Sequence, residues 1–279
     1  MNFDRVQISL VPRTTADCLD MAVMFISRRL PAMMLLWCAV ALPSCLTVYL
    51  MCSFFEADAL WAAAVIFLTS SPLGVCLGLL AVPSAFGEPF ALQTLWRRLR
   101  HGNRMLLLQG IALRFVIWAG LLLCLIPGCW IAVRTGFFVE KACFSKRVRK
   151  LHDRQTDDLL KEEAGNLVYR VLWIFAYCLL LWGVLFVSLD VACSVLFSVP
   201  ILFGRVFTAA DSMLPLEVFI DLIWYDPLVL TALTATALLV YPIGRLAWFF
   251  CYVDLRVRRD CWDMQLRFAE EARRLEVPA

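Results

Sequence analysis

The feature that most constrains this chain is a series of apolar runs, several of which are long enough to cross a bilayer. A transmembrane helix needs about 20 consecutive apolar residues. Hydrophobic residues make up 62% of the sequence and the mean hydropathy is +0.78, which is more apolar surface than a soluble domain can hide. The sequence therefore predicts an all-α fold, a polytopic transmembrane helical bundle, and leaves no room for a soluble catalytic domain.

About six spans are expected on the length criterion. Their approximate bounds are residues 31–55, 60–82, 105–126, 129–144, 167–189 and 227–252. The transmembrane domain would cover residues 31–253. An amphipathic surface helix in residues 1–30 would precede it, and a charged cytoplasmic helix in residues 254–279 would follow it.

Residues 105–144 are expected to form a helical hairpin. Its turn contains Pro127 and Gly128, because proline cannot continue a helix and glycine tolerates a tight turn. The second arm, 129–144, is short, so it either crosses the bilayer with few residues or is partly re-entrant. Residues 191–204 leave a similar alternative, since they either extend the preceding helix or lie along the far surface.

Two amphipathic segments outside the spans are expected to form interfacial helices. In the first, Thr14 and Asp17 have the spacing of a capping box. Its apolar stripe consists of Leu19, Ala22, Val23, Ile26 and Leu30. The second segment is residues 83–104, with Leu92, Leu95, Trp96 and Leu99 on one face and Arg97, Arg98, Arg100 and His101 on the other. Tryptophan beside arginine is typical of anchoring at the headgroup layer, and a specific site for anionic lipid is the sharper alternative.

The distribution of basic residues indicates the orientation of the chain. Lysine and arginine gather in the N-terminal segment, in residues 97–104, in residues 146–154 and in the C-terminal tail. With six spans, all of these segments lie on one side, so the positive-inside rule places both termini in the cytoplasm. The clustering is an orientation signal, and it gives no indication of nucleic-acid binding. The polar stretch 145–166 is interpreted as a solvated loop, with a docking site for a partner as the alternative.

Four charged residues within or beside the apolar runs are the candidate functional residues: Arg114, Arg134, Glu140 and Arg245. Arg114 lies roughly 14 Å into its span at about 1.5 Å per residue, close to the midplane. A charge at that depth must be paired or functional. We therefore expect Glu140 to pair with Arg114 or Arg245. These charges either line a solute or proton path or fix the register of the helices.

Close helix packing is expected at Gly74 and Gly78, whose spacing suits small-residue contacts between membrane helices; a flexible joint is the alternative. The 12 cysteines include no CxxC pair and are interpreted as small buried apolar residues. No metal site or cofactor is expected. Asp190, near the outer boundary, is expected to be solvated.

The tail sequence Tyr252-Val-Asp254-Leu-Arg256-Val-Arg258-Arg259-Asp260-Cys261-Trp262-Asp263 resembles the ending "Y-x-D-L-R-x-R-x-E-G-x-D-L" of a broad bacterial membrane family. The family includes the membrane domain associated with glycerophosphoryl diester phosphodiesterases and the YciC-like proteins. The step Leu-Ile-Pro127-Gly128-x5-Arg134, followed by Glu140, is similar to a second hallmark. Cys261 and Asp260 depart from the family pattern, so the chain resembles a divergent member.

This resemblance implies a six-helix accessory protein of the bacterial plasma membrane, and it implies no chemistry. The phosphodiesterase domain of some relatives lies outside this sequence, so its activity is not carried over. The sequence has no nucleophile elbow, HExxH, P-loop or dinucleotide fingerprint.

The first functional hypothesis is a non-enzymatic accessory or scaffold subunit of a membrane assembly, in contact with anionic lipid headgroups and with a membrane or cytoplasmic protein partner. The second is a small permease-like transporter whose path is lined by Arg114, Arg134, Glu140 and Arg245. An intramembrane enzyme acting on lipid ranks third, because no acid-base pair is apparent.

Overall fold

The computed structural model describes residues 13–85, 95–97, 104–123, 128, 131–132, 134–145, 164–209 and 215–260. Every regular element in these ranges is a helix, which confirms the prediction of an all-α bundle. The helices are α1 (Thr15–Ser27), α2 (Leu30–Phe55), α3 (Ala59–Ala85), α5 (Arg104–Leu123), α7 (Phe138–Ser145), α9 (Ala164–Phe197), α10 (Phe203–Ala209), α11 (Pro215–Tyr225) and α12 (Pro227–Asp260).

Four of the described helices, α2, α3, α9 and α12, are long and apolar enough to cross a membrane. They coincide with the runs expected at residues 31–55, 60–82, 167–189 and 227–252. Helix α9 continues to Phe197 before the chain turns into α10, so the first half of the segment 191–204 extends the helix and the second half leads into α10.

The expected hairpin is built from shorter pieces. The apolar part of α5 is Met105–Gly120. The second arm is interrupted by a turn at Gly136 and Phe137 before the eight-residue helix α7 begins, so its described part is not one continuous helix. The arms approach each other closely, because a Cβ atom added to Gly120 would lie 3.2 Å from the Cα atom of Gly128. Residues 124–127, at the turn itself, lie outside the described ranges.

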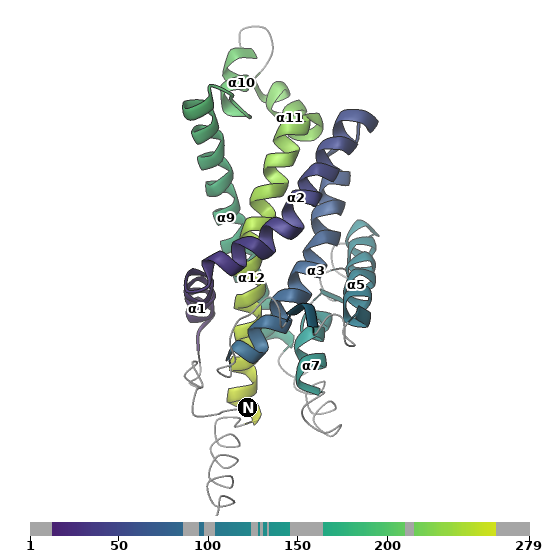
Figure 1. Ribbon diagram of the computed structural model, residues 1–279, viewed down its shortest axis with the longest axis vertical. Coiled ribbons are helices and arrows are strands. Elements are labelled where there is room, and N and C mark those ends of the chain that lie inside the picture. Colours follow the sequence, from purple (N-terminus) through teal and green to yellow (C-terminus); the bar gives the residue numbers. More distant parts are fainter. Residues whose placement is uncertain are drawn as a thin grey trace, which may run out of the picture.

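Helix α12 runs through the centre of the molecule, and α1, α2, α3 and α9 pack around it (Figure 1). Its residues Leu238, Ala247 and Phe250 are at most 2% exposed. A helix that is apolar on all sides is stable only when other helices cover it. One covering contact is a parallel stack of the rings of Trp248 and Phe137, whose centroids are 4.4 Å apart.

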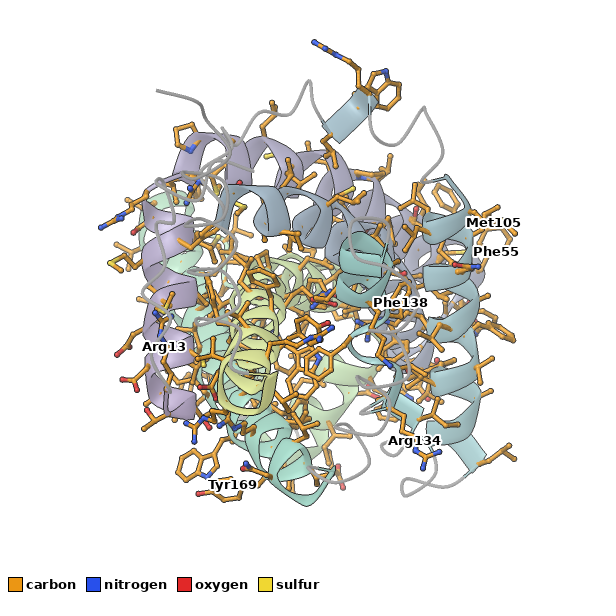
Figure 2. All side chains as sticks on the ribbon, turned by 90° about the horizontal axis from the view of Figure 1, so that it is seen from below. Arg13, Phe55, Met105, Arg134, Phe138 and Tyr169 are labelled. Carbon is orange, nitrogen blue, oxygen red and sulfur yellow. The ribbon has the colours of Figure 1, made fainter. Side chains whose placement is uncertain are left out.

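The surface helix α1 begins as the sequence predicted. Thr14 and Asp17 form the expected capping box, and the hydrogen bonds from Thr14 hold the pKa of Asp17 below its usual range. Figure 2, a view along the bundle, shows α1 lying across the direction of α12. Its buried residues are Cys18, Leu19, Ala22 and Phe25, whereas Val23 of the expected stripe is 41% exposed. The buried face of α1, which packs against α12, is therefore rotated relative to the expected stripe.

Of the second amphipathic segment, 83–104, the structure describes a short helical piece at residues 95–97 and the two ends of the segment. There Leu95 is 6% exposed and Trp96 is 70% exposed, so these two residues do not share a buried face. The polar stretch 145–166 and the tail beyond Asp260 lie almost entirely outside the described residues.

Candidate intramembrane binding site

The glycine pair of α3 allows long side chains from α12 to lie against the α3 backbone. A Cβ atom added to Gly74 would lie 2.4 Å from the Tyr241 hydroxyl and 3.5 Å from Nε of Arg245. One added to Gly78 would lie 2.6 Å from Cγ1 of Val139 and 3.6 Å from Nη2 of Arg245. The pair therefore supports close packing, as the sequence predicted, and it also makes room for two polar side chains of α12.

Arg245 forms the ion pair that the sequence predicted for Glu140. The Arg245 Nη1 atom and the Glu140 Oε1 atom are 2.5 Å apart, and the two side chains are 8% and 0% exposed. Among the described residues, no hydrogen-bond donor reaches the second carboxylate oxygen, Oε2. The pair is electrically matched, but its polar atoms are incompletely satisfied, and such a site is costly in a low-dielectric surrounding.

Arg114, on α5, is held by aromatic side chains. Its Nη2 atom donates a hydrogen bond of 3.1 Å to the Tyr241 hydroxyl. Its guanidinium carbon lies 5.1 Å from the ring centroid of Phe67 and 5.9 Å from that of Tyr241. In the part of the chain that the structure describes, Arg114 has no carboxylate partner. Ring faces attract a cation but do not neutralise it, so Arg114 keeps its full positive charge.

Both arginines face a cavity of about 720 Å³ between α3, α5, α7, α9 and α12. Most of its lining is apolar, including Phe67, Ile117 and Val171. The lining also contains the hydroxyls of Tyr241, Ser71 and Thr135, in addition to the guanidinium groups of Arg114 and Arg245. Small-molecule sites have this character, an apolar chamber of about 300–1,000 Å³ with a few convergent polar groups.

The structure separates the fourth candidate from the other three. Arg134 is exposed at the edge of the bundle, as Figure 2 shows, and does not line the cavity. Glu140 lies behind Arg245 and also does not line it. The candidate network therefore reduces to Arg114 and Arg245 at the cavity wall, with Glu140 as the counter-charge of Arg245.

A second buried ionic site, which the sequence indicated only in part, lies near the end of α12. Asp254 is 2% exposed and accepts hydrogen bonds from Nη1 of Arg170 at 2.7 Å and from Nε of Arg258 at 3.0 Å. It also accepts one from the backbone N–H of Arg13, at 2.7 Å. Asp254 and Arg258 are four residues apart on one helix, a spacing that favours such a contact. Arg170 was missed, because an arginine near the start of a span is ordinarily expected to extend to the headgroups.

Asp190 is a correction to the sequence analysis. It was expected to be solvated, but it is 2% exposed. Its carboxylate accepts hydrogen bonds from the backbone N–H groups of Ile201, Leu202 and Phe203, at 2.8, 2.8 and 3.0 Å. The carboxylate satisfies donors at the start of α10, where backbone N–H groups have no partners within the helix.

The described cysteines are free thiols. Two of them, Cys18 on α1 and Cys251 on α12, are completely buried and form a side-chain hydrogen bond with each other. This contact raises the pKa of the Cys18 thiol above its usual range. Among the described residues, no group of three or more histidine, cysteine, aspartate or glutamate side chains could hold a metal ion.

Comparisons with models of protein families, with curated proteins and with solved structures find no match. The geometry of the chain itself therefore carries the functional argument. Its two distinctive sites are the cavity with Arg114 and Arg245 and the buried contact of Asp254 with Arg13, Arg170 and Arg258.

Proposed function

We propose that this multi-pass membrane protein binds a small molecule inside the bilayer, in the cavity between α3, α5, α7, α9 and α12, and acts as a small permease-like protein. The single observation that supports this is a cavity of about 720 Å³, at the level of the spans, lined by two arginines. Ionisable residues at membrane depth usually mark a binding site or a path. No acid-base pair lines the described cavity, so the proposal does not include catalysis.

The test is a pair of small-to-large substitutions on otherwise intact protein. Ala237 lines the cavity, so Ala237→Phe fills part of it. Ala176 lies on α9, is exposed and does not line the cavity, so Ala176→Phe is the matched control. After purification in mild detergent, mass spectrometry should find a small molecule bound to the wild type and to Ala176→Phe, and a reduced amount on Ala237→Phe. Equal amounts on all three proteins would refute the proposal.

The accessory-subunit hypothesis remains a second candidate, and the outer face of α9 favours it. Only 11% of the residues in the apolar stretch of α9 are buried inside the protein. Tyr169 and Trp173 form an edge-to-face pair on it, with centroids 6.2 Å apart, and are 58% and 56% exposed. Aromatic residues are enriched in protein interfaces. A photo-crosslinking residue at Trp173 should capture a protein partner in native membranes, and capture of lipid alone would count against this candidate.

The proposed location is a bacterial inner membrane, with both ends of the described chain facing the cytoplasm and anionic lipid headgroups as partners. Arg13, just before α1, forms hydrogen bonds with Asp254 and Arg258 near the end of α12. This contact supports placing the start of α1 and the end of α12 on the same side of the membrane. The positive-inside rule assigns that side to the cytoplasm. The kinship with the phosphodiesterase-associated membrane family is likewise a proposal. It rests on the tail motif, whose Tyr252 and Asp254 are buried at this end of the bundle.

The orientation can be tested with single cysteines added to a cysteine-free variant at Glu56 and at Arg28. Glu56 lies in the turn between α2 and α3, and Arg28 lies between α1 and α2 at the other end of α2. A membrane-impermeant maleimide applied to intact cells should label the cysteine at position 56 and leave the one at position 28 unlabelled. The reverse pattern would invert the proposed topology.

A further inference from the structure

The charges at the cavity do not balance. Arg245 is neutralised by Glu140, whose carboxylate is completely buried behind it. Arg114 is the other cation of the described lining, and its described contacts are a hydroxyl and two aromatic rings. The described site therefore carries one net positive charge at the level of the spans. Because an unneutralised charge is unfavourable there, the cavity favours an occupant with one negative charge.

The cavity is also open toward the surrounding hydrocarbon. Phe175 and Leu179 of α9 line it, yet they are 62% and 50% exposed. They lie roughly 15–21 Å along the span that begins at Gly165, at about 1.5 Å per residue, so this side faces acyl chains rather than water. A molecule that enters there must itself partition into the bilayer.

Cation and apolar surface lie at different parts of the cavity. The guanidinium of Arg114 is held beside Tyr241 and Phe67, whereas Ile174, Phe175 and Leu179 form the apolar wall on α9. A molecule that satisfies both parts has an anionic head and an apolar body. The volume of about 720 Å³ lies within the usual range of small-molecule sites, which favours one chain over two.

We propose that the cavity binds a single-chain amphiphile with one negative charge, whose head group pairs with Arg114 and whose chain lies along α9. This inference rests on the proposed function and names its ligand class. A carboxylate head and a phosphodiester head share the required chemistry, since both accept two parallel hydrogen bonds from a guanidinium. Arg245 is not the anchor, because Glu140 already satisfies its charge.

The experiment measures equilibrium binding to the full chain in nanodiscs of phosphatidylcholine, which has no net charge. The probes are hexadecanoate, lysophosphatidylglycerol with the same chain, and the neutral alcohol hexadecanol. The buffer is held at about pH 8.5, because desolvation raises the pKa of a carboxylic acid. A charge-assisted hydrogen bond changes affinity by at least about tenfold, so one or both anions should bind at least tenfold more tightly than hexadecanol.

Variants locate the head group. Arg114→Gln should lower the affinity for the anionic probe about tenfold or more and leave hexadecanol unchanged. Arg114→Lys, which keeps the charge, should recover part of the loss. Tyr241→Phe removes the hydrogen bond to Arg114 but keeps the cation, so it should still prefer the anion. Arg205→Gln is the control, because Arg205 lies outside the cavity and is paired with Asp226.

The outcomes separate this inference from the function on which it rests. If hexadecanol binds as tightly as both anions, and binding is lost in Ala237→Phe, the cavity binds molecules but the anionic class is wrong. If no probe distinguishes Ala237→Phe from Ala176→Phe, the proposed function fails as well. The comparison of the three probes on the wild type needs no variant, so it holds even if Arg114→Gln does not fold. The relative affinities of the two anions identify the source of the head group, a fatty acid or a lysophospholipid.

Discussion

Helix α12 carries two buried ionic sites of opposite character. At Asp254 the carboxylate has three donor groups, from Arg170, Arg258 and the backbone of Arg13, and they come from three parts of the chain. At Arg245 the partner carboxylate of Glu140 is equally buried, but one of its oxygens has no donor among the described residues. A fully satisfied polar network specifies one packing, whereas a partly satisfied one is under electrostatic strain. The first site is suited to joining helices and the second to a functional cavity.

The largest effect is expected from Asp254→Asn. It leaves Arg170 and Arg258 near the end of the bundle without their counter-charge, and removing one partner of a buried pair costs about 3–5 kcal/mol. Thermal unfolding of the purified protein in detergent, followed by tryptophan fluorescence, should show a large fall in the melting temperature.

Asp221→Asn is the control for that measurement, because Asp221 is exposed on α11. It should unfold like the wild type. If Asp254→Asn also unfolds like the wild type, the two ionic sites do not differ in the way described above.

The next effect in size is expected at the pair of Glu140 and Arg245. Glu140→Gln and Arg245→Gln each leave one buried charge uncompensated, whereas the double variant leaves none. The double variant should therefore be more stable than the sum of the single effects predicts, by about 0.5–3 kcal/mol. A double-mutant cycle on unfolding in detergent measures this coupling, and strictly additive effects would mean that the two side chains do not interact.

A smaller effect is expected from Gly74→Ala. The new Cβ atom would lie 2.4 Å from the Tyr241 hydroxyl, so this hydroxyl must move, and its hydrogen bond with Arg114 is disturbed. We expect a loss of about 1 kcal/mol, comparable to the hydrogen bond that is disturbed. Gly183→Ala is the matched control on α9, where nothing lies within 4 Å of the added atom. The control should be neutral or slightly stabilising, and equal effects at the two glycines would argue against the tight contact.

The smallest effect is expected from Arg205→Gln. The Nη1 atom of Arg205 and the Oδ2 atom of Asp226 are 2.6 Å apart, but the arginine side chain is 39% exposed. Exposed ion pairs contribute roughly 0–1 kcal/mol, and salt screens them. The melting temperature should fall by little, and less still at high salt. A loss as large as that of Asp254→Asn would show that burial does not explain the ranking.

Apolar periodicity and length predicted most of the fold, because helices that cross a bilayer must satisfy their backbone groups internally. The pairing of Glu140 was predictable for a related reason, since few acidic residues lie deep enough to neutralise an arginine. The capping box at Thr14 and the packing at Gly74 and Gly78 were also local signals that the structure confirms.

The remainder depends on contacts between distant parts of the chain. Arg170 and Asp254 are 84 residues apart, and neither residue indicates the other. Asp190 was wrongly expected to be solvated, because its partners are backbone groups of the following turn, which carry no sequence signature. The cavity results from the way five helices cross, so its position and volume follow from no single segment.

The hydrogen bond from Arg13 to Asp254 joins residues 241 positions apart. During synthesis, α1 emerges from the ribosome long before α12 exists, so it cannot reach its final position while the intervening helices are being inserted. Until then its apolar face, with Leu19 and Phe25, needs another cover, and the membrane surface is the nearest one. Docking of α1 against α12 is therefore a late step of biogenesis, and a truncated chain that lacks α12 should keep α1 accessible to protease.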